Sequence, residues 1–259
     1  KDKPIIDGLF FWLCSLVRYI GVMFFLLFMI SLFSCGPKQY TPASPQTVSQ
    51  VKRVIQKHLF AIGKDELLTR KTAVIKGTLR RMDSAETLRF TTYREAPNKI
   101  KTIVKRNNGS VIERGFDGQK GWIKQGNLVQ PLQGVELQKI QRAADFFFDV
   151  NYQTWYTQVY EKGEEQYASR PCHTITVRNQ FGELETIYFD QESGLKIGLA
   201  IWKDGEEDKK YWYRYGHYIN VDGVQIPLSI EEFDGNIRKV TLIESVKWDR
   251  KKVPKIKHP

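Results

Sequence analysis

Apolar and polar residues alternate with a period of two along most of the chain after Thr72. Runs of this kind, bounded by Gly, Asn and Asp, are typical of antiparallel strands joined by short turns. Turn sequences such as RNNGS and FDGQKG separate several of the runs. The pattern predicts roughly a dozen strands, in the segments TAVIKGTLRR, LRFTTYREA, NKIKTIVKR, GSVIERGF, KGWIKQG, NLVQPL, YTQVYEKG, RPCHTITVRNQFG, ELETIYFDQESG, LKIGLAIWKDG, KKYWYRYGHYINVDG, VQIPLSIEEFDG and NIRKVTLIESVKWD.

A helical spacing of three and four residues precedes the strands. The segment 47–63 can begin at Thr47 or Ser49 as N-cap and can end at Gly63, and a further helical turn is expected over residues 65–70. The apolar face of this helix consists of Val51, Val54, Ile55, Leu59 and Ile62.

A second helix is predicted between strands, over residues 134–150, with an apolar face of Val135, Ile140, Ala143 or Ala144, and Phe147. Strands and helices do not alternate as they do in parallel sheets. A long antiparallel meander with two amphipathic helices can curl into an open barrel whose mouth the helices cover. We therefore predict a mainly β (α+β) fold, a half-open antiparallel β-barrel with a helical lid.

Aromatic residues are frequent, with 15 Phe, 12 Tyr and 6 Trp. They can line an apolar cavity or fill an ordinary core, and alternation leaves both possibilities open because it does not say which face of a strand points inward. For Trp122 the two roles carry equal weight. In a hollow barrel the candidate lining residues are Ile75, Leu79, Phe90, Trp122, Ile187, Phe189, Leu199 and Ile201, with Phe147 on the lid.

An uncharged apolar run extends from Tyr19 to Phe33 and is followed by Cys35. The run is shorter than the about 20 residues that a spanning helix needs, and it suits the core of a signal peptide. Its end, LFSCG, resembles the bacterial lipobox, which implies cleavage before Cys35 and attachment of lipid to its thiol. The alternative is a transmembrane anchor over residues 9–33, which would bury Arg18 at a cost of at least about 2.5 kcal/mol.

These features divide the chain into four parts. Residues 1–34 are the expected signal peptide or membrane segment, and residues 35–46 hold the lipidated cysteine and a proline-rich flexible tether. Residues 47–249 form the expected single domain, and residues 250–259 are a basic C-terminal tail. Because Gly36 rather than Asp follows the cysteine, we expect an outer-membrane lipoprotein facing the periplasm, with anchoring in the inner membrane as the alternative.

The formal net charge of the 259-residue chain is +11. Lys and Arg are scattered rather than gathered on one helix, and an exported protein meets no DNA in its compartment, so we expect no nucleic-acid partner. Solubility is the preferred explanation of the charge, and attraction to an anionic lipid surface is the alternative.

The chemistry-bearing residues do not form a catalytic or metal site in the sequence. His58, His173, His217 and His258 lack the spacing of metal ligands. Cys172 and His173 are adjacent in a strand and therefore point to opposite faces. We expect no enzyme activity, no metal and no cofactor.

Several strings together resemble the outer-membrane lipoprotein-sorting superfamily, the LolA/LolB-like proteins. They are HLFAIGKDELLTRKTAVIKGTL, REAPNKI, GFDGQKGW, YFDQESGLKIGL and VDGVQIPLSI, and they extend over roughly residues 50–248. The resemblance implies a half-open barrel with a helical lid around an apolar cavity for acyl chains. The expected partners are therefore acyl chains of a lipid or lipoprotein, bound by a monomer attached to the membrane through Cys35.

One position departs from the family pattern. In the soluble carriers, an Arg directly before Pro-Asn bonds to the lid, whereas here that position is Ala96. Arg94 lies two residues earlier, on the same face of the strand, and is our candidate for lid closure. The rival interpretation of the whole chain is a structural or envelope-assembly lipoprotein with a filled core and no ligand.

Overall fold

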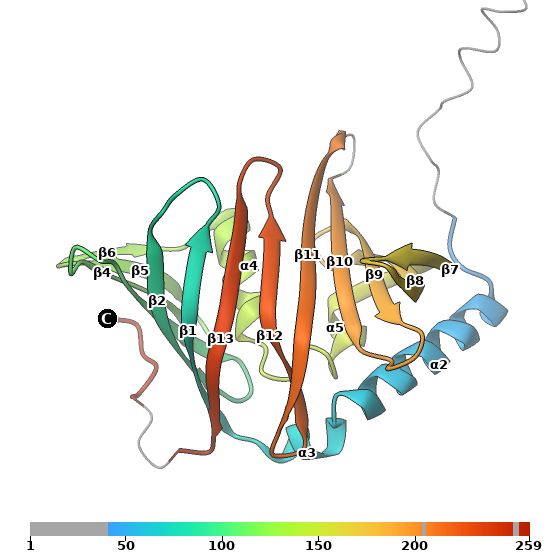
Figure 1. The fold of residues 1–259 in the computed structure, drawn as a ribbon, viewed down its shortest axis with the longest axis horizontal. Helices are drawn as coiled ribbons and strands as arrows, with labels where there is room; N and C mark the ends of the chain where they lie inside the picture. The colour runs from blue at the N-terminus through green and yellow to red at the C-terminus, as the bar shows by residue number, and fades with distance from the viewer. Residues whose placement is uncertain (1–40, 204–205, 251–253) are drawn as a thin grey trace, which may run out of the picture. The chain divides into compact units, whose positions relative to one another are not determined.

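In the described part of the chain, thirteen strands form one antiparallel sheet in which the first strand pairs with the last (Figure 1). The computed structural model describes residues 41–203, 206–250 and 254–259, and the part from Pro42 to Pro259 forms one unit. The predictions for Cys35 and its lipobox lie outside the described residues.

The strand order along the sheet is β6-β5-β4-β3-β2-β1-β13-β12-β11-β10-β9-β8-β7. We call β1–β6 the first wing and β7–β13 the second wing. The first wing consists of β1 (Thr72–Arg81), β2 (Thr87–Glu95), β3 (Lys99–Lys105), β4 (Val111–Phe116), β5 (Gly121–Gln125) and β6 (Leu128–Pro131). The second wing consists of β7 (Tyr156–Tyr167), β8 (Arg170–Asn179), β9 (Leu184–Asp190), β10 (Lys196–Lys203), β11 (Glu206–Val221), β12 (Val224–Phe233) and β13 (Arg238–Trp248).

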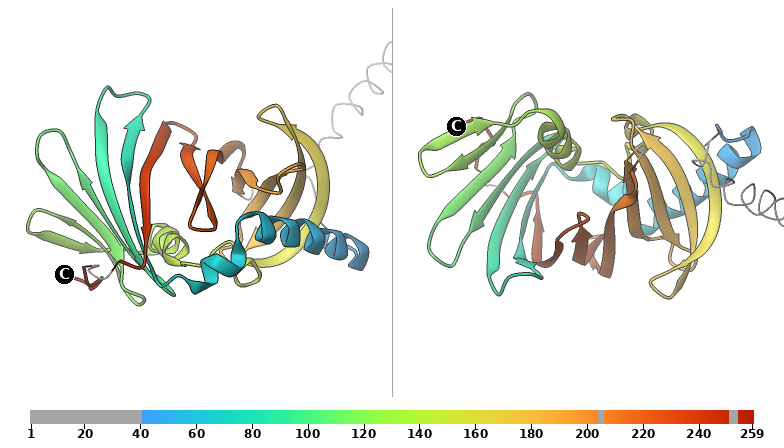
Figure 2. Two further views of the ribbon diagram at one scale, coloured as in Figure 1. Left: turned by 60° about the horizontal axis from the view of Figure 1, so that its bottom comes forward. Right: turned by 90° about the horizontal axis from the view of Figure 1, so that it is seen from above.

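The sheet is curved, and within the described residues its two edge strands, β6 and β7, are not paired with each other (Figure 2). Residues 132–155 carry the chain from one edge to the other and include α4 (Gly134–Ala144) and α5 (Tyr152–Trp155). We call this connection the crossover. The half-open barrel with helices across it is the architecture that the alternation predicted.

Helix α2 (Pro45–Ala61) lies across the second wing, and α3 (Lys64–Thr69) follows it. Helix α2 begins two residues before the predicted Thr47, because the N-cap is Ser44 and not Thr47 or Ser49. The Ser44 hydroxyl accepts a hydrogen bond from the Thr47 N–H at 3.2 Å. Pro45 occupies the first turn, where its missing N–H costs nothing. The predicted tether therefore loses its last two residues to the helix.

Helix α4 ends at Ala144, so the prediction of a helix to residue 150 is wrong. Asp145 is the reason: its carboxylate accepts hydrogen bonds from the Phe147 N–H at 3.0 Å and from Trp155 Nε1 at 2.6 Å. A side chain that bonds to nearby backbone and side-chain donors favours a turn over a continued helix. Val135, expected on the apolar face, is 59% exposed.

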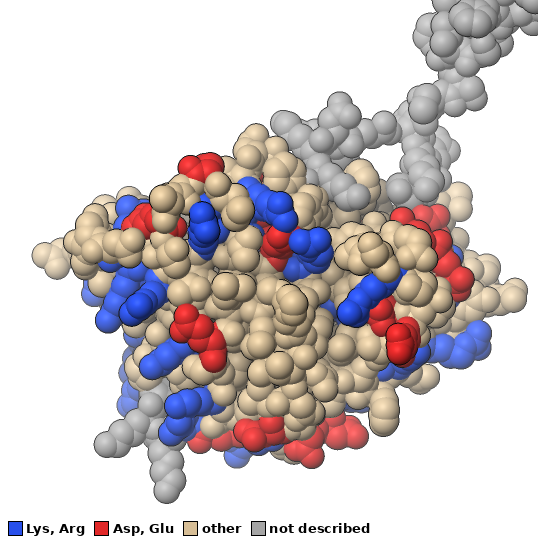
Figure 3. Space-filling model, in the orientation of Figure 1, with Lys and Arg blue, Asp and Glu red and all other residues tan. Residues whose placement is uncertain are grey.

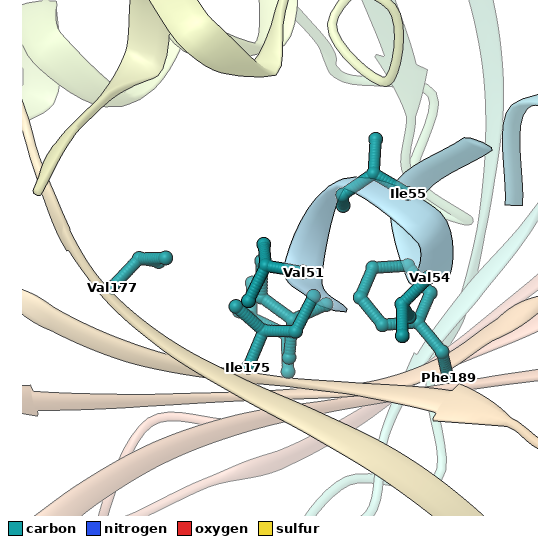
Figure 4. Packing of buried hydrophobic residues seen from close by; sticks show 8 residues of the cluster. Val51, Val54, Ile55, Ile175, Val177 and Phe189 are labelled. Carbon is teal, nitrogen blue, oxygen red and sulfur yellow. The ribbon is translucent and has the colours of Figure 1, made fainter. Parts of the chain in front are cut away.

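Two apolar cores lie on the concave face of the sheet, one under each main helix. Val51, Val54 and Ile55 of α2 pack against the second wing (Figure 4), where their partners are Ile175, Val177, Ile187, Phe189 and Leu199. Ile140 and Ala144 of α4 pack against Ile100 and Phe116 of the first wing. Among the described residues, no helix has the length and apolar character needed to cross a membrane.

Candidate functional site

A cavity of about 210 Å³ lies between α2, the crossover and the second wing. Most of its lining is aliphatic or aromatic. Helix α2 contributes Val48, Val51, Lys52, Ile55 and His58, and the crossover contributes Phe148, Asp149, Tyr152 and Gln153. The strands contribute Tyr156, Val159, Ile175, Val177, Ile187, Phe189 and Lys196.

The lining of the cavity extends along α2. Its residues on that helix run from Val48 to His58 at intervals of three or four residues, which keeps these side chains on one face. At 1.5 Å per residue, the two ends lie about 15 Å apart along the helix axis. An apolar lining that extends along a helix in this way suits a linear alkyl chain.

Three titratable side chains gather at the His58 end. Lys196 forms an ion pair with Asp149, and the Lys196 Nζ atom also lies 5.4 Å from the centre of the Phe148 ring. The Nε2 atom of His58 lies 4.0 Å from Asp149 Oδ1, and its Nδ1 atom lies 3.1 Å from the Gly194 carbonyl oxygen. Burial lowers the pKa of His58 to about 4 despite the nearby Asp149 carboxylate, so the ring is neutral near pH 7.

No family model and no curated protein matches this sequence. Many solved structures match the fold, and three of them are described here. A DUF1329 family protein from Desulfovibrio piger gives a TM-score of 0.56 at 13% identity, covering 78% of this chain and 95% of that one. A LolA superfamily protein from Nitrosomonas europaea gives 0.55 at 12% identity, covering 78% and 94%. A putative outer membrane lipoprotein-sorting protein domain from Vibrio parahaemolyticus gives 0.53 at 6% identity, covering 77% and 95%.

The domain has a LolA-like fold. At these identities the likeness is one of architecture, and it agrees with the fold implied by the sequence strings. The functional residues of this LolA-like domain must therefore be found from its own geometry.

Two of the predicted lining residues, Ile187 and Phe189, line the cavity. Leu199 and Ile201 lie on the second wing and belong to the apolar core beside it, but not to the lining itself. The described residues place Ile75, Leu79 and Phe90 on the first wing, half-buried and outside this cavity. Strand pairing puts these three on the same face of the sheet as Arg94.

Trp122 does not line the cavity, and of the two roles left open for it, it has that of a packed strand residue. Trp122 pairs with Gly115 across β4 and β5. Gly121, which precedes Trp122 in the strand, faces Leu137 and Ile140 of α4. Since successive residues of a strand point to opposite faces, Trp122 lies on the convex face. Its side chain is 0% exposed, and its ring lies 5.6 Å from that of His258 in the C-terminal segment.

The C-terminal segment covers this convex site. Ile256 is 3% exposed, and the backbone N–H of His258 donates to Asp117. This hydrogen bond, with those from the Gln119 and Lys120 N–H groups, holds the pKa of Asp117 below its usual value against the opposing effect of burial. The basic tail of the sequence therefore includes a packed segment.

Phe147 lies in the turn after α4, not on the helix, and it is not part of the cavity lining. Its ring packs 5.1 Å from that of Phe146, whereas the next residue, Phe148, lines the cavity. Because α4 ends early, the side chains of Phe146, Phe147 and Phe148 point in other directions than they would in a continuous helix.

Arg94 contacts the crossover. Its Nη2 atom donates hydrogen bonds to the carbonyl oxygens of Ala143 at 3.1 Å and Asp145 at 2.6 Å. These carbonyls belong to the last turn of α4, where the helix leaves its carbonyl groups without partners and where a positive charge is favourable. The first wing is thus joined to the crossover by a side chain of β2.

Arg142 of α4 joins the crossover to the second wing. Its guanidinium forms a two-pronged ion pair with the fully buried Glu185 of β9, with Nη2 to Oε2 at 2.7 Å. Tyr156 donates to Glu185 Oε2 at 3.0 Å, and Asn179 donates to Oε1 at 2.7 Å. Burial would lower the pKa of Arg142, but its hydrogen bonds to Glu185 raise it above the usual value.

Sequence reasoning missed the contribution of α2 to the lining. The signal was present, because His58 follows Ile55 by three residues, the spacing that also separates Val51 from Val54 on the apolar stripe. The predicted apolar face includes Leu59 and not His58. A polar residue on the buried side of an amphipathic helix was the clue to a polar end of the cavity.

A second hollow, of about 710 Å³, lies mainly over the convex side of β10–β13. Its lining includes the charged side chains of Arg170, Arg214 and Glu231. Glu231 is paired with Arg214 and Arg238, and Arg170 is 3.5 Å from Asp190. Basic and acidic side chains are interspersed on the face drawn in Figure 3. The apolar cavity is the better candidate for a ligand, because the charges of the convex hollow already neutralise one another.

The described residues hold no group of three or more His, Cys, Asp or Glu side chains placed to bind a metal ion. Cys172 is buried in a separate cluster with Tyr188, and burial raises the pKa of its thiol. A protonated buried thiol is a poor nucleophile.

Proposed function

We propose that this LolA-like domain binds an acyl chain of a lipid or lipoprotein in the cavity between α2 and the second wing, without catalysis. The observation that carries the proposal is the apolar, elongated lining along one face of α2. Each buried methylene contributes about 0.8 kcal/mol, so a chain can be held with little polar recognition.

The size of the cavity limits the number of acyl chains that one domain can bind. A volume of about 210 Å³ is below the range of roughly 300–1,000 Å³ that is usual for drug-sized ligands. We therefore propose one chain per domain. Larger ligands would require α2 or the crossover to move, and we propose that Arg94 helps to hold the crossover closed.

A filled cavity provides the test. Val159→Phe adds volume to a half-buried lining position of β7, and Val104→Phe makes the same change at a half-buried position of β3 outside the cavity. We expect Val159→Phe to weaken the binding of a fluorescent fatty-alcohol analogue at least about tenfold, while Val104→Phe leaves it near the wild-type value. Equal binding by both variants would contradict the proposed site.

The rival function is a structural or envelope-assembly lipoprotein without a ligand. Native mass spectrometry of protein purified from membranes separates the two functions: a lipid that co-purifies supports the carrier, and a bare mass under gentle conditions supports the rival.

We propose that the chain is anchored through lipid on Cys35, in the outer membrane and facing the periplasm, as a monomer. The support is the lipobox-like sequence and Gly36, together with the fold. Two or three acyl chains on one residue give stable membrane attachment, whereas one chain binds reversibly. Cys35→Ser should abolish labelling with radioactive fatty acid and leave an unprocessed precursor, and cleavage followed by release as soluble protein would refute the lipobox.

A further inference from the structure

His58 has one ring nitrogen without a hydrogen-bond partner among the described residues. The residue is 3% exposed, and its ring centre lies 5.0 Å from that of Phe189. The free atom is Nε2. Asp149 Oδ1, at 4.0 Å, is too far away to form a hydrogen bond with it.

The other nitrogen fixes the tautomer. Nδ1 lies 3.1 Å from the carbonyl oxygen of Gly194, and a carbonyl oxygen can only accept a hydrogen bond. Nδ1 therefore carries the proton, and in the neutral ring Nε2 is left with a lone pair. A buried acceptor without a donor is unfavourable, and this one belongs to the lining of the cavity.

We propose that the ligand carries a hydrogen-bond donor at its polar end, a hydroxyl or an amide N–H, which bonds to Nε2 of His58. The inference rests on the proposed function and deepens it by naming the chemical class of the bound end. The alkyl part lies along α2 toward Val48, about 15 Å away. An ester, an ether or an ionised carboxylate offers only acceptors, which cannot satisfy a lone pair.

The charges beside His58 support a neutral end group. Lys196 is already paired with Asp149, so it does not present an unbalanced positive charge to an ionised carboxylate. Asp149 also lies within 4.0 Å of Nε2, where it would repel a second negative charge. A neutral hydroxyl or amide needs no counter-ion and is not repelled by Asp149.

The experiment compares three probes with the same alkyl chain, decan-1-ol, decanamide and 1-methoxydecane, by isothermal titration calorimetry with the full domain. Decan-1-ol or decanamide, or both, should bind roughly tenfold more tightly than the ether, as expected for one satisfied acceptor. The stronger of the two then identifies whether the natural end is a hydroxyl or an amide. In His58→Phe this preference should disappear, whereas His258→Phe, the same change in the C-terminal segment, should retain it.

A spectroscopic measurement makes the test independent of the variants. The ¹⁵N resonance of His58 Nε2 should shift on addition of decan-1-ol or decanamide and stay in place with the ether. Equal affinity for all three probes would overturn the donor proposal and leave the proposed function intact. Failure of all three to bind would refute both, and a preference that survived in His58→Phe would exclude His58 as the acceptor.

Discussion

Trp122 and Gly115 lie directly opposite each other on β5 and β4, and the indole ring occupies the space where a side chain at Gly115 would stand. A Cβ atom at Gly115 would lie 2.4 Å from Cζ2 of Trp122. The convex face of the first wing is therefore packed at this point, because the indole lies between Gly115 and the C-terminal segment that covers it from outside.

Gly115→Ala should destabilise the domain by about 1–3 kcal/mol, because the added methyl overpacks a rigid aromatic contact. Urea unfolding followed by circular dichroism measures the change. Gly163→Ala is the matched control, since its Cβ would meet only the flexible hydroxyl of Thr174. A Gly115→Ala protein as stable as wild type would contradict the packing described.

Trp122→Ala should cost about 3–5 kcal/mol of unfolding free energy, as the loss of a large buried side chain does. It should leave the affinity for a fluorescent fatty-alcohol analogue unchanged at temperatures where the variant is folded, because the ring lies on the face opposite the cavity. Phe189→Ala, within the lining, should lower both quantities. A loss of affinity in Trp122→Ala alone would place the ligand on the convex side.

Glu185→Gln should destabilise the domain by about 3–5 kcal/mol, because it leaves the charge of Arg142 buried without its counter-ion. The same change at Glu136, which is an exposed partner of Lys139 on α4, should cost about 1 kcal/mol or less. Chemical denaturation of both variants gives the comparison. Equal effects would mean that the buried ion pair is screened by water.

Arg94→Met should loosen the crossover, because the last carbonyls of α4 lose a charged donor worth about 1.5–3 kcal/mol. Hydrogen exchange of the amides in residues 143–150 should become faster. Arg114→Met is the control, since Arg114 donates to the Glu136 carbonyl in the first turn of the same helix. Unchanged exchange in Arg94→Met would show that packing alone holds the crossover.

The stability of the domain should rise with pH between about 4 and 6.5. The pKa of His58 is lowered from 6.5 to about 4 in the folded protein, so in this interval the unfolded chain binds more protons than the native state. The part of the unfolding free energy that depends on neutral His58 is fully present above pH 6.5 and is lost as the pH falls toward 4. It amounts to about 3 kcal/mol. His58→Phe should flatten this part of the profile, and an unchanged slope would show that His58 is not titrating as a buried group.

The sequence by itself determined the strands, the two main helices and their order. A period of two is satisfied only by extended strands. Short Asp-Gly and Asn-Gly turns can join neighbouring strands only if these strands are antiparallel. The apolar stripe from Val51 to Ile62 likewise required a helix packed on one face. The half-open barrel with helices across it followed from these local rules, and the comparison structures share that fold.

Only the tertiary structure decided which side of each strand is inside. A period of two is identical for the two faces of a sheet, so Trp122 and Phe189 carry the same local signal although one lies under the C-terminal segment and the other lines the cavity. The polar contacts of the site are also nonlocal: Arg142 and Glu185 are 43 residues apart, and His58 meets the carbonyl of a residue 136 positions away. No spacing in the sequence encodes such pairs, because the curvature of the sheet and the path of the crossover bring them together.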